Sequence, residues 1–82
     1  MKKYGIDIVN EWGNVHNDKM KGVKFFDHKV EAIEWGDTHT HEDDPIACDY
    51  YVFEVESDIV IFSTFPKYKD DPIKSRFEIL DI

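Results

Sequence analysis

The residues best suited to chemistry stand together in one segment, His39-Thr40-His41-Glu42-Asp43-Asp44. Imidazoles and carboxylates are common ligands of Zn²⁺ and related ions, and His-x-His brings two imidazoles within reach of one ion. His39 and His41, with Asp43 or Glu42, are therefore weak candidates for a small metal site. The alternative is an acidic loop whose histidines titrate freely.

Covalent chemistry has less support in the sequence. Cys48 with His39 or His41 has the residue types of a nucleophile and its base, but no surrounding motif orients them. A cysteine that follows Ala47 in a strand is typical of a small buried hydrophobe. The chain has no glycine-rich phosphate loop and no Cys-x-x-Cys. We predict that this protein is not an enzyme, and we expect no cofactor.

Hydrophobic periodicity predicts the elements that position these residues. Strands are predicted over 2–12, 48–56, 59–65 and 75–82, with a further short strand over 23–26 left open. Residues 27–36 are the helix candidate, with Asp27 as N-cap, Gly36 as the stop, and Phe26, Val30 and Ile33 on the inner side. A strand over 29–35 is the alternative for this segment.

The apolar pattern over residues 48–82 predicts an antiparallel meander. In residues 48–56, Tyr51, Phe53 and Val55 share one face, and Tyr50 and Val52 share the other. Residues 59–65 are apolar on both faces at first, which predicts a central strand, and Pro66 ends it.

Residues 67–72 are predicted to turn the chain, and the last strand to direct Phe77 and Ile79 inward. We expect a single α+β domain over residues 1–82, with an antiparallel sheet of three to five strands and one short helix on one face. The expected order is strand, optional strand, helix and three strands.

The negative charge is concentrated in the middle of the chain. The net charge is −8, but residues 27–58 contain eleven acidic residues and a single basic one, Lys29, so this stretch alone carries −10. A one-sided charge of this density repels itself and nucleic acid, and it attracts cations and basic protein surfaces. The simplest interpretation is a solvated surface that maintains solubility.

A second interpretation is an anionic face that occupies the basic groove of a nucleic-acid-binding protein. Residues two apart on one side of a strand are about 6.6–6.8 Å apart, and Glu54, Glu56 and Asp58 have this spacing. Aromatic residues are enriched among contacts that dominate binding energy. The predicted partner-binding residues are Glu31, Glu34, Trp35, Glu42, Asp43, Asp44, Tyr50, Glu54, Glu56 and Asp58.

The function expected from these features is binding of a basic protein surface. The leading hypothesis is a nucleic-acid mimic, similar in size, acidity and lack of motifs to phage-encoded inhibitors of host defence such as anti-CRISPR proteins. Alternatives are an immunity or antitoxin-like protein that neutralises a basic toxin, a small metal-binding protein using the loop over residues 39–44, and a structural subunit. With one cysteine and no apolar run long enough for a membrane span, we expect a cytoplasmic protein that binds neither membrane nor nucleic acid directly.

Overall fold

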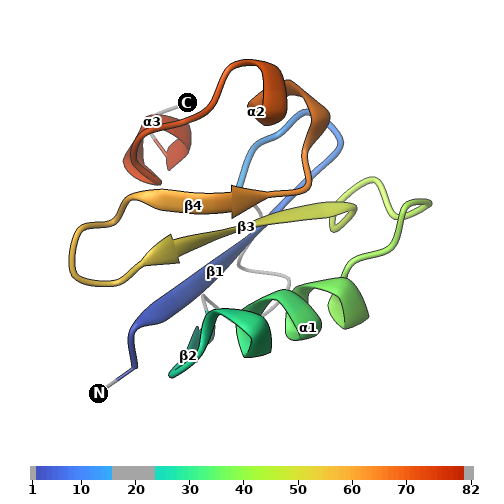
Figure 1. The fold of residues 1–82 in the computed structure, drawn as a ribbon. Coiled ribbons are helices and arrows are strands. Elements are labelled where there is room, and N and C mark those ends of the chain that lie inside the picture. Colours follow the sequence, from blue (N-terminus) through green and yellow to red (C-terminus); the bar gives the residue numbers. More distant parts are fainter. Residues whose placement is uncertain (1, 16–23, 81–82) are drawn as a thin grey trace.

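A four-stranded antiparallel sheet organises the chain in the computed structural model, which describes residues 2–15 and 24–80 (Figure 1). The strands are β1 (Tyr4–Val9), β2 (Lys24–Phe26), β3 (Asp49–Glu54) and β4 (Val60–Ser63), in the spatial order β2-β1-β3-β4. The helices are α1 (Lys29–His39), α2 (Pro66–Asp70) and α3 (Phe77–Leu80). α1 packs on one face, against β1, β2 and β3. The predicted α+β class is confirmed.

The two faces of the sheet are both covered, which explains why the residues between the ends of β1 and β3 are buried on both faces. On the α1 side the buried core contains Ile6, Ile8, Ala32, Ala47, Tyr50 and Val52. On the other side Val9, Tyr51 and Phe53 pack against residues that follow β4, among them Phe65, Tyr68 and Ile73. The predicted alternation of Tyr50 and Val52 against Tyr51 and Phe53 is therefore confirmed. The short strand over 23–26 also forms, as β2.

The helix forms where it was predicted but with different ends, and the strand alternative over 29–35 is wrong. The N-cap is His28 rather than Asp27, and the Glu31 carboxylate accepts a hydrogen bond from the His28 N–H at 3.1 Å. This contact lets Glu31 satisfy one of the donors that a helix leaves free at its first turn. Asp27 instead lies 3.5 Å from the Lys2 ammonium.

Gly36 lies inside the helix and does not end it. A Cβ at this position would lie 2.7 Å from the side chains of Ile6 and Tyr50, so glycine permits close packing of α1 on the sheet. Ala32, one turn earlier, is buried in the same contact, whereas Val30 is 58% exposed. The prediction of an inward Val30 is wrong because Ala32 and Gly36 lie at the centre of this contact, with Ile33 partly buried beside them.

β4 is an edge strand, so the prediction of a central strand over residues 59–65 is wrong, and the fifth strand predicted over 75–82 is absent from the described residues. Ser75 makes an isolated bridge to Ile59, after which the chain turns into α3. Phe77, predicted to point inward, is 49% exposed. Ile79, also predicted to point inward, lies outside the described side chains. The sequence pattern failed here because Arg76, not an apolar residue, is the anchor of this segment.

The remaining connections differ less from expectation. Gly13 adopts a φ of 85° in the turn after β1, a conformation that glycine tolerates best. Pro66 follows β4 as predicted, and it begins α2, a short helix that takes up most of the turn predicted over residues 67–72. The loop predicted over 15–22 lies mostly outside the described residues. No helix in the described part of the chain is long and apolar enough to span a membrane.

Candidate interaction surface

The acidic residues of α1 lie on its exposed side. Glu31 caps the first turn, and Glu34 is exposed one turn later. Asp37 is also exposed, and its carboxylate accepts a 2.6 Å hydrogen bond from the Tyr50 hydroxyl. A carboxylate in the last turn of a helix is opposed by the helix dipole, so the Tyr50 contact helps to hold Asp37 at a position that otherwise costs stability.

The loop after α1 continues this charge. Glu42 and Asp43 are exposed, whereas the Asp44 carboxylate is half-buried and accepts hydrogen bonds from the backbone N–H groups of Ile46 and Ala47. Asp44 therefore shapes the loop, a common task for aspartate at a turn. Glu42 and Asp43 are the loop carboxylates best placed to meet another molecule.

The predicted row of Glu54, Glu56 and Asp58 does not form. β3 ends at Glu54, and Glu56 and Asp58 lie in the turn to β4, so the two-residue period of a strand does not reach them. Asp58 has a φ of 60° and its carboxylate is 3.8 Å from the Arg76 guanidinium. The row was wrong because the strand is shorter than its alternating pattern.

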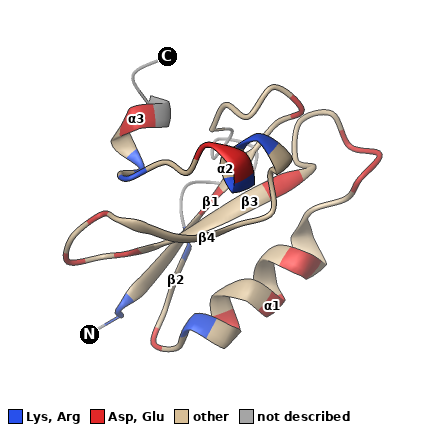
Figure 2. Cartoon of the chain, turned by 45° about the horizontal axis from the view of Figure 1, so that its top comes forward, with Lys and Arg blue, Asp and Glu red and all other residues tan. Residues whose placement is uncertain are grey.

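The charge at this turn is also offset by its neighbours. A depression of about 680 Å³ is lined by Glu54 and Glu56 together with Lys2 and Lys3. Figure 2 shows acidic residues along α1 and its following loop, and a second group at the β3–β4 turn. In Figures 1 and 2, α1 lies along one face of the sheet and its following loop lies at the end away from the β3–β4 turn, so the single predicted face is divided.

One part of the divided face keeps its charge uncompensated. We call it the helix–loop surface and define it by Glu31, Glu34, Asp37, Glu42 and Asp43. Within residues 30–66 the sequence has ten carboxylates and no lysine or arginine. Among the described residues, none of these five carboxylates makes an ion pair with a lysine or arginine.

The predicted aromatic contacts have different positions. Tyr50 is 1% exposed because β3 is a central strand under α1, and we remove it from the candidate surface. Burial, and then the Asp37 carboxylate, raises the pKa of the Tyr50 hydroxyl. Trp35 is half-buried, with its ring stacked on His39 at 4.1 Å between centroids and tilted against Phe26 at 6.1 Å. Trp35 therefore has only part of its ring available beside the helix–loop surface.

The histidines do not form a metal site in the described chain. The His39 ring lies on Trp35, and its Nδ1 is 2.8 Å from the Trp35 backbone oxygen. His41 lies beyond the helix, in the exposed loop. In the part of the chain that the structure describes, no three His, Cys, Asp or Glu side chains are grouped so as to hold an ion.

Sequence reasoning missed the residues that extend the helix–loop surface at one end. The Glu11 N–H donates to the Pro45 oxygen at 2.9 Å, which joins the turn after β1 to the loop after α1. A cavity of about 510 Å³ lies at this junction, lined by Glu11, Glu42, Cys48, Asp49, Phe65 and Pro66. Trp12, next to Glu11, is 70% exposed. Its type was visible in the sequence, but the contact of the neighbouring Glu11 with the loop depends on tertiary structure.

Cys48 in this cavity is not an activated nucleophile. Burial, and then the neighbouring Asp49 carboxylate, raises the pKa of its thiol. A raised pKa reduces the thiolate fraction at neutral pH, and the thiolate is the reactive form. The cavity therefore offers carboxylates and an apolar wall, without a nucleophile.

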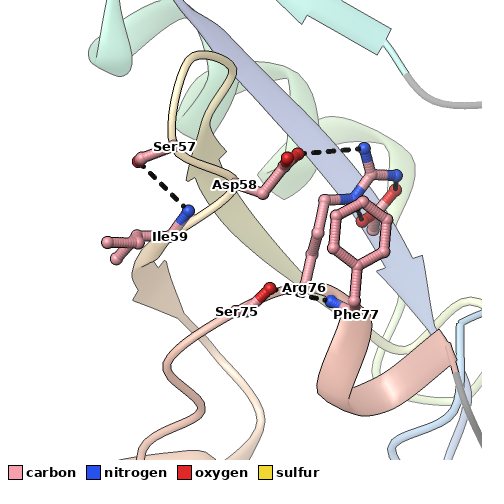
Figure 3. Close-up of polar contacts among 7 residues, drawn as sticks. Ser57, Asp58, Ile59, Ser75, Arg76 and Phe77 are labelled. Atoms are coloured by element: carbon pink, nitrogen blue, oxygen red, sulfur yellow. Dashed lines mark hydrogen bonds and ion pairs between the residues drawn. The ribbon is translucent and has the colours of Figure 1, made fainter.

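On the opposite face, the sequence also missed a buried ion pair. The Arg76 guanidinium donates two hydrogen bonds to the Asp7 carboxylate, each 3.0 Å long, and Asp7 is completely buried. The guanidinium carbon lies 4.0 Å from the centroid of the Phe53 ring. Figure 3 shows the same guanidinium reaching Asp58. Arg76 therefore ties the C-terminal segment to β1, β3 and the hairpin turn.

Comparison with protein-family models, with curated proteins and with solved structures finds no match for this chain.

Proposed function

We propose that this protein binds a basic surface of a partner protein, of the kind that normally holds nucleic acid, and inhibits the partner by occupying that surface. The observation that carries the proposal is the helix–loop surface. Its five carboxylates lie along one helix and its following loop, in a stretch of 37 residues without lysine or arginine. In Figure 2 every charged residue of α1 and its following loop beyond the first helical turn is acidic.

The physical consequences of such a surface favour recognition at a distance. Carboxylates of one sign attract a positively charged groove before contact, which raises the rate of association and makes it sensitive to salt. Nucleic acid presents the same sign and is held by the same lysines and arginines. A protein with this surface therefore competes with nucleic acid for one groove.

Trp12 adds an exposed aromatic side chain that can be buried in an interface, besides the electrostatic attraction. It is 70% exposed and directly follows Glu11, whose N–H donates to Pro45 in the loop that carries Glu42. Tryptophan is enriched among residues that dominate the energy of protein interfaces. We expect Trp12 to supply affinity at the end of the helix–loop surface, where the carboxylates supply attraction.

The test is capture from a host lysate followed by competition. Immobilised protein should retain a basic partner, release it at about 0.5 M salt, where charges are screened beyond about 4 Å, and release it when DNA or RNA is added. The partner's own binding to nucleic acid should fall when this protein is present. A partner that ignores both salt and nucleic acid would contradict the proposal, and a basic toxin without nucleic-acid binding would favour the immunity-protein alternative.

Matched variants locate the contact. The triple variant Glu34→Gln, Glu42→Gln, Asp43→Asn removes three charges from the helix–loop surface and should abolish capture. The control variant Glu54→Gln, Glu56→Gln, Glu78→Gln removes three exposed charges elsewhere and should retain it. Equal loss in both variants would mean that net charge, rather than this surface, determines binding.

A further inference from the structure

A cavity of about 510 Å³ lies where the turn after β1, the loop after α1 and the end of β4 meet. We call it the junction cavity, and its lining residues are Glu11, Glu42, Cys48, Asp49, Phe65 and Pro66. Its volume is within the range of about 300–1,000 Å³ that is typical of small-molecule pockets. Carboxylates beside an apolar wall suit a cation that carries an apolar stem, as the side chains of lysine and arginine do.

The walls of the junction cavity are held in place by contacts outside it. The Phe65 ring packs on the Tyr68 ring, with 4.9 Å between the centroids, and the Tyr68 hydroxyl donates to the Gly13 oxygen. The Asp49 carboxylate accepts a hydrogen bond from the Thr64 hydroxyl at 2.8 Å. A site whose walls are already fixed loses less conformational freedom when a ligand binds, so more of the contact energy remains as affinity.

The negative charge of the junction cavity is not offset by a base within the described chain. Glu11 and Glu42 are exposed and make no ion pair with any described residue. Lys67, in α2, is exposed, does not line the cavity and belongs to no ion pair there either. Burial, and then the charges of Asp49 and Glu11, raise the pKa of the Cys48 thiol, as a negative potential inside the cavity should.

The opposite face of the sheet shows how this protein holds a guanidinium. Arg76 donates to Asp7, reaches the Asp58 carboxylate at 3.8 Å (Figure 3) and lies 4.0 Å from the centroid of the Phe53 ring. The junction cavity presents the same kinds of group, carboxylates from different segments beside the aromatic Phe65. A planar guanidinium can donate to two carboxylates while it covers a ring, whereas an ammonium is a compact charge. The lining therefore favours arginine over lysine.

We propose that the junction cavity binds one arginine side chain of the partner, with the guanidinium at Glu11 and Glu42 and the aliphatic stem along the apolar wall. That the arginine belongs to a basic partner protein rests on the proposed function. Arginine is a principal side chain for holding phosphate, so its capture would remove one of the partner's contacts with nucleic acid. Trp12, which follows Glu11 and is 70% exposed, is available to the residues that flank the bound arginine.

The test uses three end-blocked tripeptides, each with glycine on both sides of arginine, lysine or citrulline, titrated into the whole protein and followed by NMR. The arginine peptide should shift the amide signals of Glu11, Glu42 and Cys48. The lysine peptide should bind about tenfold more weakly, because an ammonium cannot donate in a planar fork or cover a ring. The citrulline peptide has nearly the shape of the arginine peptide without its charge, and it should cause no shift.

Matched variants separate the junction cavity from the overall charge. Glu11→Gln removes one charge from the cavity and none from the helix–loop surface, and it should weaken binding of the arginine peptide about tenfold. Glu54→Gln removes one exposed charge at the opposite end of β3 from Asp49 and should leave the affinity unchanged. Thermal unfolding of both variants verifies that they are folded.

The possible outcomes separate this inference from the proposed function. Shifts confined to α1, equal affinities for the arginine and lysine peptides, equal weakening by the two variants, or no binding at all would overturn the arginine pocket. None of these results overturns the proposed function, because the helix–loop surface can attract a basic partner without a pocket. Conversely, a lysate that yields no partner released by salt and nucleic acid would overturn the function, while the peptide titration continues to judge the pocket.

Discussion

The two faces of the sheet use charge in opposite ways. Beneath the C-terminal segment, the Asp7 carboxylate is buried and receives two hydrogen bonds from Arg76. On the helix–loop surface, Glu34, Glu42 and Asp43 are exposed and have no ion pair among the described residues. The buried pair fixes the C-terminal segment against β1, because a buried carboxylate is tolerated only with a partner. The exposed carboxylates hold nothing in place and are available to another molecule.

This contrast separates residues needed for folding from the residues that we propose for recognition. Buried charges are tolerated only when paired, since desolvation costs several kcal/mol per ion. Unpaired charges of one sign on a small surface repel each other and lower the stability of the fold. Four variants test whether the separation holds, beginning with the one expected to lower stability most.

Arg76→Ala should destabilise the protein most, by about 3–5 kcal/mol, because it leaves the buried Asp7 carboxylate without the guanidinium. The free energy of unfolding from urea titration measures this change. Lys74→Ala, two residues away and exposed, is the matched control and should change it by no more than about 0.5 kcal/mol. Similar small effects for both variants would show that the ion pair does not anchor the C-terminal segment.

Tyr50→Phe should cost less, about 1–2 kcal/mol, because it removes the hydrogen bond to Asp37 and leaves the packing of the ring unchanged. The urea midpoint should fall at an unchanged dependence on denaturant. Tyr4→Phe removes a hydroxyl for which the described residues show no hydrogen bond, and it should leave the midpoint unaltered. An unchanged midpoint for Tyr50→Phe would mean that the Asp37 contact contributes nothing.

The part of this architecture visible in the sequence was the part built from local patterns. Alternation in residues 48–56 predicted both faces of β3, and the glycine turn after β1 was visible in the same way. The helix was located from its apolar spacing, yet its end was misjudged. Gly36 has a packing role that depends on Ile6 and Tyr50, residues far away in the chain.

The parts that could not be predicted depend on contacts between distant residues. Nothing near Arg76 indicates that its guanidinium reaches Asp7, and this contact replaces the predicted last strand. The division of the acidic face has the same origin, because charge along the sequence does not show where α1 and the β3–β4 turn lie. Tyr50 was expected on the surface because the period of a strand does not show which face a helix will cover.

Tyr51→Phe should leave stability unchanged or raise it by up to about 1 kcal/mol. The Tyr51 hydroxyl is buried and makes no hydrogen bond within the described residues, so its removal relieves a desolvation cost. Burial, and then the Asp7 carboxylate, raises the pKa of this hydroxyl above its ordinary value of 10.0. The neutral hydroxyl is therefore favoured in the folded state.

The same shift gives a pH dependence with a defined sign. Below pH 10 both states hold the Tyr51 proton and the wild-type stability is fully present. Above it the unfolded chain releases the proton first, so stability falls as pH rises. Urea titrations below and above pH 10 measure the free energy of unfolding. This free energy should decline less with rising pH for Tyr51→Phe than for the wild type. Parallel declines would place the Tyr51 hydroxyl in a solvated environment.

The smallest expected effect on stability belongs to the triple variant Glu34→Gln, Glu42→Gln, Asp43→Asn. Removing like charges from the helix–loop surface should raise the free energy of unfolding by no more than about 0.5 kcal/mol, because exposed charges interact weakly. Salt screens the same repulsion, so the gain should shrink as ionic strength increases. A loss of more than about 1 kcal/mol would show that these carboxylates hold the fold together. The surface would then have a structural role like that of Asp7, and the contrast between the two faces would fail.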